Sequence, residues 1–447
     1  MMVQLESEQE TPLEIQLKKL YSEISAEKSP EREILEKWRT KSWERFLDIG
    51  LPTRHVEAYN YIRMRALCTQ PYVRAEVTQI IPQRIQAAIY PECRHSYLVF
   101  VNGHYQQHLS NTEALPKQLV ILKLSDAMRT YGALLNNQWA KSIKEEKDAF
   151  ALLNGALHEE GIFLYLPPKM AVHAPLQIIH AIDTSENPML LLPRLNLFMG
   201  AHAVLSLIST QVVLSGKGYG YGINSLCDIT IEEGAHVQFT QTALDGGVDS
   251  WHFEALRATL KRNSSLKTVN VTEGSATVRN DYNVILMGEN AEAILNGVSM
   301  LTGKNEAHSH IVMEHQAPHC RSMQLFKTVV SDSARSSFEG KILVRQLAQK
   351  TEAFQLNNNL VLSDHAFAYS KPNLEIFADD VKATHGSTVG QLDPEQLLYL
   401  ATRGFLKTDA KNLLIYGFCQ EVIDKIPLVS LVEAISKRAR QFCLKTD

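Results

Sequence analysis

The sequence predicts a mainly β protein with a parallel β-helix core, a solenoid of stacked turns, between an N-terminal and a C-terminal helical domain. From about residue 160 to residue 390, runs of four to eight residues rich in Ile, Leu and Val alternate with polar turn clusters, without helical segments between them. A turn, a small residue and a strand recur in order, starting at Gly200, Gly234, Asn263, Asn290 and Ser333. The intervals of 34, 29, 27 and 43 residues are typical of stacked solenoid turns, or else of a large sandwich. Only 22 of 447 residues are glycine, which disfavours many two-residue hairpins and so favours the β-helix.

Residues 1–145 are predicted to form a mostly helical domain. Apolar residues at three- and four-residue intervals predict helix over residues 12–48. Thr53 has a side chain suited to capping, so we expect a second helix that ends near Leu67. A short β-rich segment is expected near residues 97–105.

The predicted β-helix core spans residues 146–391, and residues 392–447 are predicted to form the C-terminal helical domain. A proline directly after Asp393 indicates a helix start, and Gly404 and Pro427 separate three segments with helical spacing. A domain of roughly 55 residues is too small to be very stable alone. We therefore expect several of its apolar side chains to contact a partner or the open end of the solenoid: Leu397, Leu398, Leu414, Ile415 and Phe418.

Composition excludes several classes of protein. The 45 Lys and Arg residues against 49 Asp and Glu give a net charge of −4, which argues against a nucleic-acid binder or a binder of anionic membranes. No apolar run approaches the roughly 18 to 20 residues of a membrane helix, and the acidic N-terminus resembles neither a signal nor a transit peptide. We expect a cytoplasmic protein. Its six cysteines form no C-x-x-C pair, so neither a disulfide framework nor a zinc knuckle is expected.

The densest group of titratable residues includes His308, His310 and His315. On a strand, His308 and His310 would project from one face, where paired imidazoles are plausible metal ligands. One hypothesis is therefore a stand-alone metal-dependent β-solenoid enzyme that uses these three histidines. The alternative is that they are ordinary strand histidines, hydrogen-bonded or solvated.

A second cluster holds Asp379, Asp380, Lys382 and His385. Paired carboxylates on a β-helix could bind calcium or act as acid and base, or could belong to an ordinary turn. The chain has no phosphate-binding P-loop, because the Gly340-Lys341 pair is followed by isoleucine. Since no motif for catalysis stands out, a non-enzymatic scaffold or interaction protein is the leading class.

One long segment resembles a known family. The matching pieces are FEGKI (Phe338–Ile342), AQKTEA (Ala348–Ala353), SKPNLEIFADDVKATHG (Ser370–Gly386), TVGQLD (Thr388–Asp393) and YLATRG (Tyr399–Gly404). Together they closely resemble the SufB/SufD family of iron–sulfur cluster assembly scaffolds. Within it, the chain is similar to SufD-like members: SufB-like chains carry a cysteine where this chain has Leu400, and they lack the K-x-x-HG step at Lys382–Gly386.

The resemblance implies a right-handed parallel β-helix that pairs with a SufB-like subunit through its end strands. It also implies that the C-terminal helices dock a SufC-like ABC ATPase, which fits a chain without a P-loop of its own. The docking candidates are Tyr399, Arg403, Gly404, Tyr416 and Phe418. A subunit with exposed β-helix ends can also form a homodimer when the SufB-like chain is absent.

The resemblance further assigns His385 to cluster assembly or iron acquisition at the SufB interface, supported by other residues of the same motif: Asp379, Asp380, Lys382 and Gly386. A neutral imidazole is a competent and labile iron ligand. SufD-like chains often have a cysteine two residues earlier, where this chain has Ala383, so a thiolate from this subunit is not expected. No tightly bound cofactor is expected, only a transient iron–sulfur cluster shared with SufB, and the sequence gives no support for a flavin. The family segment also includes His308 to Cys320, which favours a structural role for those histidines.

Overall fold

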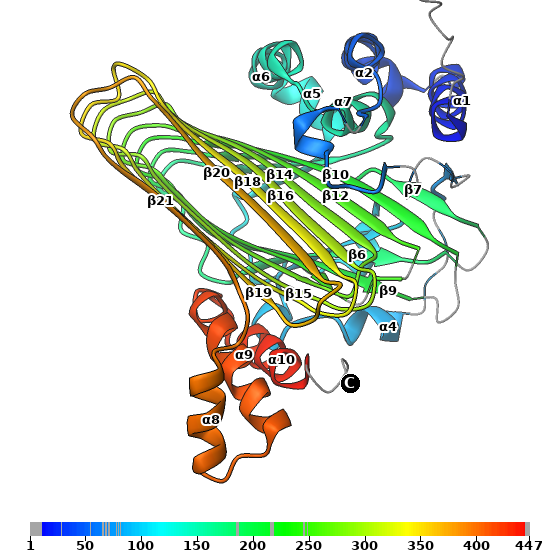
Figure 1. Cartoon of the computed structure of the whole chain (residues 1–447). Coiled ribbons are helices and arrows are strands. Elements are labelled where there is room, and N and C mark those ends of the chain that lie inside the picture. Colours follow the sequence, from blue (N-terminus) through cyan, green and yellow to red (C-terminus); the bar gives the residue numbers. More distant parts are fainter. Residues whose placement is uncertain are drawn as a thin grey trace, which may run out of the picture.

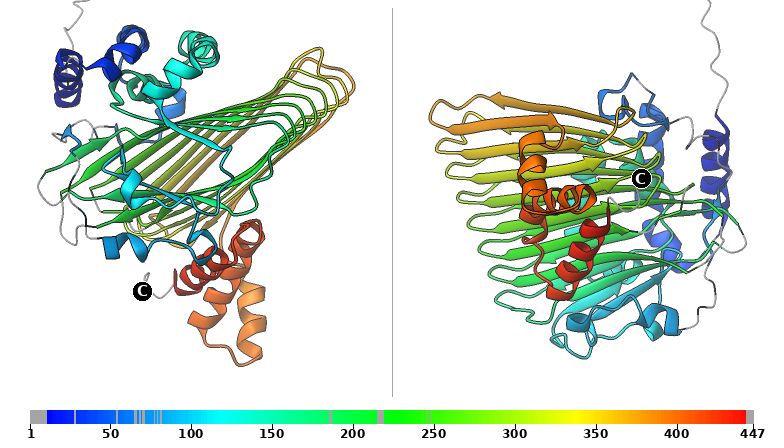
Figure 2. Two further views of the ribbon diagram at one scale, coloured as in Figure 1. Left: turned by 180° about the vertical axis from the view of Figure 1, so that it is seen from behind. Right: turned by 60° about the horizontal axis from the view of Figure 1, so that its bottom comes forward.

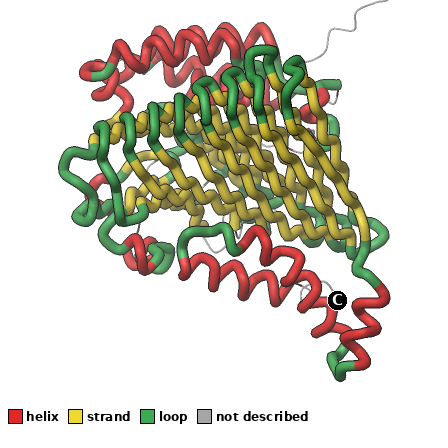
Figure 3. Tube along the Cα trace, turned by 90° about the vertical axis from the view of Figure 1, so that its left-hand side faces the viewer, coloured by secondary structure: helices red, strands yellow, loops and turns green. Residues whose placement is uncertain are grey.

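The computed structural model describes residues 11–442, except residues 28, 54, 65, 66, 68, 70, 71, 77, 79, 81, 185, 186, 215–218, 245 and 248. It confirms the predicted fold class: a β-solenoid of about eight turns with helices at both ends of the chain (Figure 1). From β8 onward successive strands alternate between two sheets, so neighbours within a sheet are parallel and come from consecutive turns (Figure 3). The hydrophobic core lies between the sheets.

The two sheets are named A and B. Sheet A contains β4 (Val120–Lys123), β5 (Ile162–Leu166), β8 (Arg194–Met199), β10 (Tyr221–Ile231), β12 (Trp251–Leu260), β14 (Thr277–Leu286), β16 (Glu306–His315), β18 (Arg335–Val344) and β20 (Phe367–Ile376), with β1 (Val73–Arg74) and β7 (Met189–Leu191) at its side. Sheet B contains β3 (His104–Tyr105), β2 (Tyr97–Val101), β6 (Leu176–Ile182), β9 (Val204–Val213), β11 (His236–Leu244), β13 (Ser265–Glu273), β15 (Glu292–Leu301), β17 (Arg321–Val330), β19 (Glu352–Val361) and β21 (Lys382–Gly390). The short strands β2 and β3 confirm the β-rich segment expected near residues 97–105.

A ladder of left-handed residues builds one corner of the solenoid. These residues have positive φ and stand once in each turn: Lys169, His202, Gly234, Asn263, Asn290, His319 and Lys350. The Asn263 N–H donates to the carbonyl of Glu289, and the Asn290 N–H donates to that of Pro318, so each turn is tied to the next. The first four starts of the recurrence seen in the sequence follow this corner. The fifth, Ser333, lies at another corner, beside the left-handed Asp332, whose Oδ2 accepts a hydrogen bond from the Gly303 N–H. That change of corner explains the longer last interval.

The N-terminal helices lie on the outer face of sheet A, except α4, which packs on sheet B, where Ile85 belongs to one cluster with Val99 and Ile179 (Figures 1 and 2). They are α1 (Pro12–Ala26), α2 (Pro30–Ile49), α4 (Pro82–Gln86), α5 (Leu124–Thr130), α6 (Gly132–Glu145) and α7 (Ala149–Leu157), with short 3-10 helices at Glu57–Tyr59, Pro91–Cys93 and Gln107–Leu109. The helix predicted over residues 12–48 is two helices, broken before Pro30. Of the helix expected to end near Leu67, the described residues show the 3-10 turn at Glu57–Tyr59 and helical backbone at Met64 and Leu67.

The 57–63 segment is held by tertiary contacts. The Tyr61 ring stacks on Tyr369 of β20 with ring centroids 4.1 Å apart. Arg63 Nε lies 2.6 Å from Glu306 Oε1 of β16, and Glu57 pairs with Lys371 of β20. These contacts reach the last turns of the solenoid.

The C-terminal helices are α8 (Pro394–Thr402), α9 (Lys407–Ile423) and α10 (Val429–Gln441), as the sequence predicts. Helices α9 and α10 pack on the outer face of sheet B (Figure 2), where Ile415 and Cys419 meet Val298 and Leu325. The expected contact of Ile415 with the open end of the solenoid is therefore wrong. Leu398 remains exposed, and no residue of α8 is buried.

Four cysteines are described, and all four are free and buried: Cys93, Cys227, Cys320 and Cys419. Cys68 and Cys443 lie outside the described residues. A search of the helices in the described part of the chain finds none with the length and apolar character of a membrane span.

Candidate functional site: the open end of the solenoid and helix α8

Strands β20 and β21 form the last turn, and no other described strand pairs with their outer edges. The Phe367 N–H donates to Ala334 and the Lys382 N–H to Thr351, both in the preceding turn. Because backbone groups alternate direction along a strand, every second N–H of β20 and β21 points away from the solenoid. In β20 one of these donors is missing, since the position is Pro372. An open edge of this kind can be extended by a strand of another chain.

Exposed apolar side chains surround this edge. They are Leu356 on β19, Phe367 and Ile376 on β20, Phe377 in the following turn and Val389 on β21. Contiguous exposed apolar surface beside unpaired backbone is typical of a protein–protein interface. The end where the family motif lies is therefore a candidate interaction surface.

His385 lies on β21, directly opposite Gln355 of β19. Its side chain is on the inward-facing side of the strand, because Ala383, two residues earlier, packs against the core between the sheets. His385 is nevertheless exposed, since no further turn covers it. It therefore lies at the mouth of the solenoid interior, and Ala383 contributes no thiol beside it.

The other residues of the motif do not converge on His385. Lys382 points outward and donates to Glu352 Oε1 at 3.0 Å. Asp380, in the loop before β21, pairs with Lys350, and Asp379 is exposed. Gly386 faces Leu356, whose Cδ1 would lie 3.0 Å from an added Cβ. Within the described residues no three His, Cys, Asp or Glu side chains are grouped to hold a metal ion, so the calcium hypothesis finds no support here.

The docking candidates fall into two groups. Tyr399, Arg403 and Gly404 form the exposed end of α8, where the Arg403 guanidinium lies 5.2 Å from the Tyr399 ring centroid. Tyr416 instead stacks under Arg440 of α10, and the Phe418 carbonyl accepts a bond from Lys327 Nζ at 3.0 Å. Tyr416 and Phe418 therefore help to fix α9 in place.

Sequence reasoning missed part of the surface at α8. The α8 patch consists of exposed apolar side chains on α8, the following loop and α9: Leu398, Tyr399, Phe405, Leu406 and Leu413. The sequence predicts that Leu398 contacts a partner or the open end of the solenoid, but it does not indicate that the solenoid leaves the whole of this face uncovered. An apolar helix face without a partner in its own chain is typical of a docking surface.

The three histidines of the metal hypothesis are not brought together. Ile311 and Met313 of β16 face the core, so His315 faces inward too, while His308 and His310 face outward. His315 Nε2 lies 2.8 Å from Ser322 Oγ across the interior. His308 Nδ1 bonds Ser337 Oγ at 2.7 Å. The hypothesis of one metal site from all three is therefore wrong, although the expectation that His308 and His310 share a face is confirmed.

His310 belongs to a buried ion network between sheet A and the N-terminal domain, here called the Arg279 network: Glu146, Asp148, Arg257, Arg279, Asp281 and His310. His310 Nδ1 lies 2.6 Å from Asp281 Oδ1. Burial alone would lower the pKa of His310, but the hydrogen bond and charge of Asp281 raise it above its ordinary value. The neighbouring carboxylate therefore favours the protonated form of the imidazole.

Exchange of His310 for glutamine is expected to cost about 1 kcal/mol at pH 5.5 and less at pH 8.5. A raised pKa means that protonated His310 stabilises the fold fully below the pKa of the unfolded chain, and that this stabilisation is lost as pH rises through the folded pKa. Urea unfolding of both chains at the two pH values measures the difference. The exposed His95, 3.3 Å from Glu113, gives the control variant His95→Gln, for which little cost is expected at either pH. A cost for His310→Gln that grows with pH would contradict the expectation.

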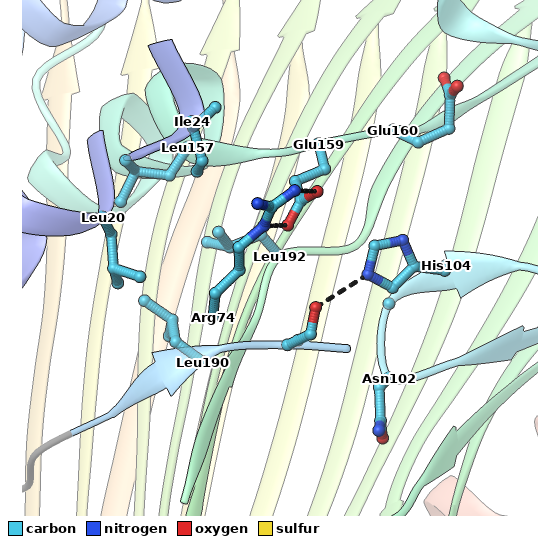
Figure 4. A pocket seen from close by; sticks show the side chains of 12 residues that line it. Leu20, Ile24, Arg74, Asn102, His104, Leu157, Glu159, Glu160, Leu190 and Leu192 are labelled. Atoms are coloured by element: carbon cyan, nitrogen blue, oxygen red, sulfur yellow. Dashed lines mark hydrogen bonds and ion pairs between the residues drawn. The ribbon is translucent and has the colours of Figure 1, made fainter. Parts of the chain in front are cut away.

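Two of the cavities among the described residues lie away from the open end and the Arg279 network. One, of about 30 Å³, lies between α1, α7 and the β1 region (Figure 4). Arg74 in its wall pairs with Glu27 and Glu159, and His104 bonds the Ala75 carbonyl. Because these contacts use the polar groups of the wall, the crevice is best explained as packing between domains.

The second cavity, of about 40 Å³, lies inside the solenoid beside His180, His252 and Glu254. Burial lowers the pKa of His180 to about 4, and burial together with His180 lowers that of His252 to about 3. Both imidazoles are therefore neutral at physiological pH. A space of this size holds a few water molecules.

Two family models match the sequence of this chain. "SUF system FeS cluster assembly, SufBD core domain" matches residues 180–418, and "SufBD protein N-terminal region" matches residues 11–178. The iron–sulfur cluster assembly protein SufD of Escherichia coli (strain K12) is 29% identical over 415 residues, which cover 89% of this chain and 90% of that protein. An iron–sulfur cluster assembly SufBD family protein of Synechocystis sp. is 29% identical over 391 residues, 86% of this chain and 85% of the relative. The assembly protein SufB of Bacillus subtilis (strain 168) is 24% identical over 434 residues, 93% and 90% of the two chains.

Proposed function

Since this chain belongs to the SufBD family of the SUF iron–sulfur cluster assembly system, we propose that it is a SufD-like, non-enzymatic scaffold subunit. It pairs with a SufB-like subunit through the open end of its solenoid and carries a SufC-like ABC ATPase on its C-terminal helices. The nascent iron–sulfur cluster is cargo, held in passing between the two scaffold subunits. The chain works in the cytoplasm without a resident cofactor, and no flavin is needed for this role.

The open edge of β20 and β21 is the observation that carries the proposal. It combines unpaired backbone groups with an apolar surround, and the partner best suited to it is another solenoid that continues the two sheets. A second copy of this chain fits the same edge when the SufB-like subunit is absent, which gives a homodimer. Pro372 limits how many backbone bonds a partner strand can form with β20.

His385 is the residue proposed to act on the cargo. It lies on the last strand, at the interior mouth and open to solvent, so a partner at the open end would enclose it. A single neutral imidazole nitrogen binds iron reversibly, which suits a cluster that must be passed on. The remaining ligands come from the SufB-like subunit, because Ala383 provides none.

The test is anaerobic co-expression of the chain with its SufB-like and ATPase partners, followed by purification through a tag on this chain. His385→Ala is expected to leave both partners bound and to lower the cluster content at least tenfold, measured by visible absorbance and by iron and sulfide analysis. His236→Ala, an exposed histidine of β11 far along the solenoid, is the matched control and should keep full cluster content. Recovery of the chain alone with a stoichiometric metal ion would overturn the scaffold role. Full cluster content in His385→Ala would overturn the role of His385.

A further inference from the structure

The position beneath His385 is occupied by a stack of two glutamines. In the register of sheet B, His385 pairs with Gln355 of β19, and Gln355 pairs with Gln324 of β17. Directly paired residues of neighbouring strands point to the same side and lie about 4.8 Å apart. The three side chains therefore form one column that leads from the solenoid interior to its mouth.

The side-chain amide of Gln355 is held in place by one hydrogen bond, and only one of its two polar atoms has a described partner. Gln355 is 2% exposed, and its Nε2 donates to Gln324 Oε1 at 3.0 Å. Its Oε1 is buried and has no hydrogen-bond partner among the described residues. A buried amide oxygen without a hydrogen-bond partner lowers the stability of the fold by about 1–3 kcal/mol. A donor that reached Gln355 Oε1 would remove this cost.

A glycine on the opposite sheet makes room for this amide. A Cβ on Gly340 of β18 would lie 2.1 Å from Gln355 Nε2, which is closer than any real contact. The amide therefore extends across the interior into the space that Gly340 leaves, which restricts its rotation. In the terminal turn the corresponding pair is His385 and Pro372, by the register of the two sheets.

We propose that Gln355 is a positioning residue for His385. Gln355 Oε1, which has no partner in the described part of the chain, accepts a hydrogen bond from one ring N–H of His385 when the exposed imidazole turns toward it, and this bond fixes a single neutral tautomer. The other ring nitrogen then carries a lone pair directed to the open end. Histidines that bind metals nearly always donate their second N–H to an acceptor that orients the ring. The inference rests on the proposed function for the use of that lone pair, but the proposed hydrogen bond involves residues of this chain alone.

The bond is tested by ¹⁵N NMR of the full chain labelled on its histidine side chains, without partners or iron. The His385 signals are assigned by their loss in His385→Gln, at about pH 8.5, where an ordinary imidazole is neutral. In the wild-type chain we expect two well-separated ring ¹⁵N shifts, one protonated and one not. In Gln355→Met, which keeps the volume and removes the acceptor, the two shifts should move toward each other as the tautomers mix.

Two variants separate positioning from packing. Gln355→Glu keeps an acceptor and should restore the wild-type separation, because Gln324 Nε2 has no described partner and can turn to donate to it. Gln324→Met removes the lower amide and should leave the His385 shifts unchanged. Equal His385 shifts in the wild type and in Gln355→Met would overturn the proposal, as would equal changes in Gln355→Met and Gln324→Met.

The assembly reaction gives an independent readout. With partners present, Gln355→Met should lower the cluster content about tenfold, within the range usual for an orienting residue of a metal ligand, and Gln355→Glu should recover most of it. If His385→Ala has no effect on cluster content while the NMR differences hold, the proposed function fails and the hydrogen bond stands. If cluster content falls in His385→Ala but the NMR shows no effect of Gln355→Met, the positioning role fails alone.

Discussion

Replacement of Arg279 by methionine should lower the free energy of unfolding by about 3–5 kcal/mol, since it removes the central cation of a buried ion network. The Arg279 side chain is 2% exposed, and its Nη2 lies 2.8 Å from Asp148 Oδ2 and 3.0 Å from Asp281 Oδ1. Its guanidinium also lies 4.1 Å from the ring centroid of Tyr59. Without Arg279, the carboxylate of Asp148 stays buried at the start of α7 with much less positive charge nearby to balance its negative charge. Urea unfolding followed by circular dichroism measures the loss.

An exposed arginine on the same sheet provides the comparison. Arg345 Nε lies 2.7 Å from Glu314 Oε1, but the Arg345 side chain is 53% exposed. Ion pairs in solvent contribute at most about 1 kcal/mol, so Arg345→Met should change stability little. Similar losses for the two variants would mean that the Arg279 network contributes no more than a surface pair.

Introduction of aspartate at both Leu398 and Leu406 should abolish copurification of the ATPase partner while the fold stays intact. The two side chains are 67% and 70% exposed in the α8 patch, so their replacement disrupts no core packing. In a complex, a buried carboxylate without a partner charge is strongly unfavourable. Loss of a central contact typically costs 2 kcal/mol or more, so the double variant should bind at least about 30-fold more weakly. Titration of the purified ATPase in a calorimeter gives the affinity.

Val429 offers a matched control in the same domain. It is 67% exposed at the start of α10 and lies outside the α8 patch. Val429→Asp adds the same charge to the same domain and should keep both ATPase binding and the melting temperature. Unchanged binding by the Leu398 and Leu406 variant, or equal loss in Val429→Asp, would exclude the α8 patch as the docking surface.

The parts of the fold that could be predicted are those set by local sequence. Asn263 and Asn290 adopt the left-handed conformation that their residue type favours, so the solenoid corner is visible as a repeat. The proline after Asp393 and the left-handed Gly404 mark the ends of α8 for the same reason. His308 and His310 share a face because strand side chains alternate.

What the sequence could not reveal depends on residues far apart in the chain. Arg279 meets Asp148 only after the solenoid and α7 have packed together, so neither residue stands out alone. Whether an apolar residue of α8 is covered depends on which face of sheet B the helices occupy. The stack of Gln324 and Gln355 requires the register of three strands, which varying turn lengths conceal.

The 57–63 segment has a consequence for the order of events during synthesis. Glu57 contacts Lys371, which leaves the ribosome 371 − 57 = 314 residues later. At about 5–20 residues per second, this interval lasts roughly 15–60 s. Until β20 has been made, Glu57 and Tyr61 lack their partners on that strand, and each newly formed turn presents unpaired edges. The 57–63 segment therefore closes onto β20 only late in translation, and until then the growing solenoid has open edges that can pair with other chains.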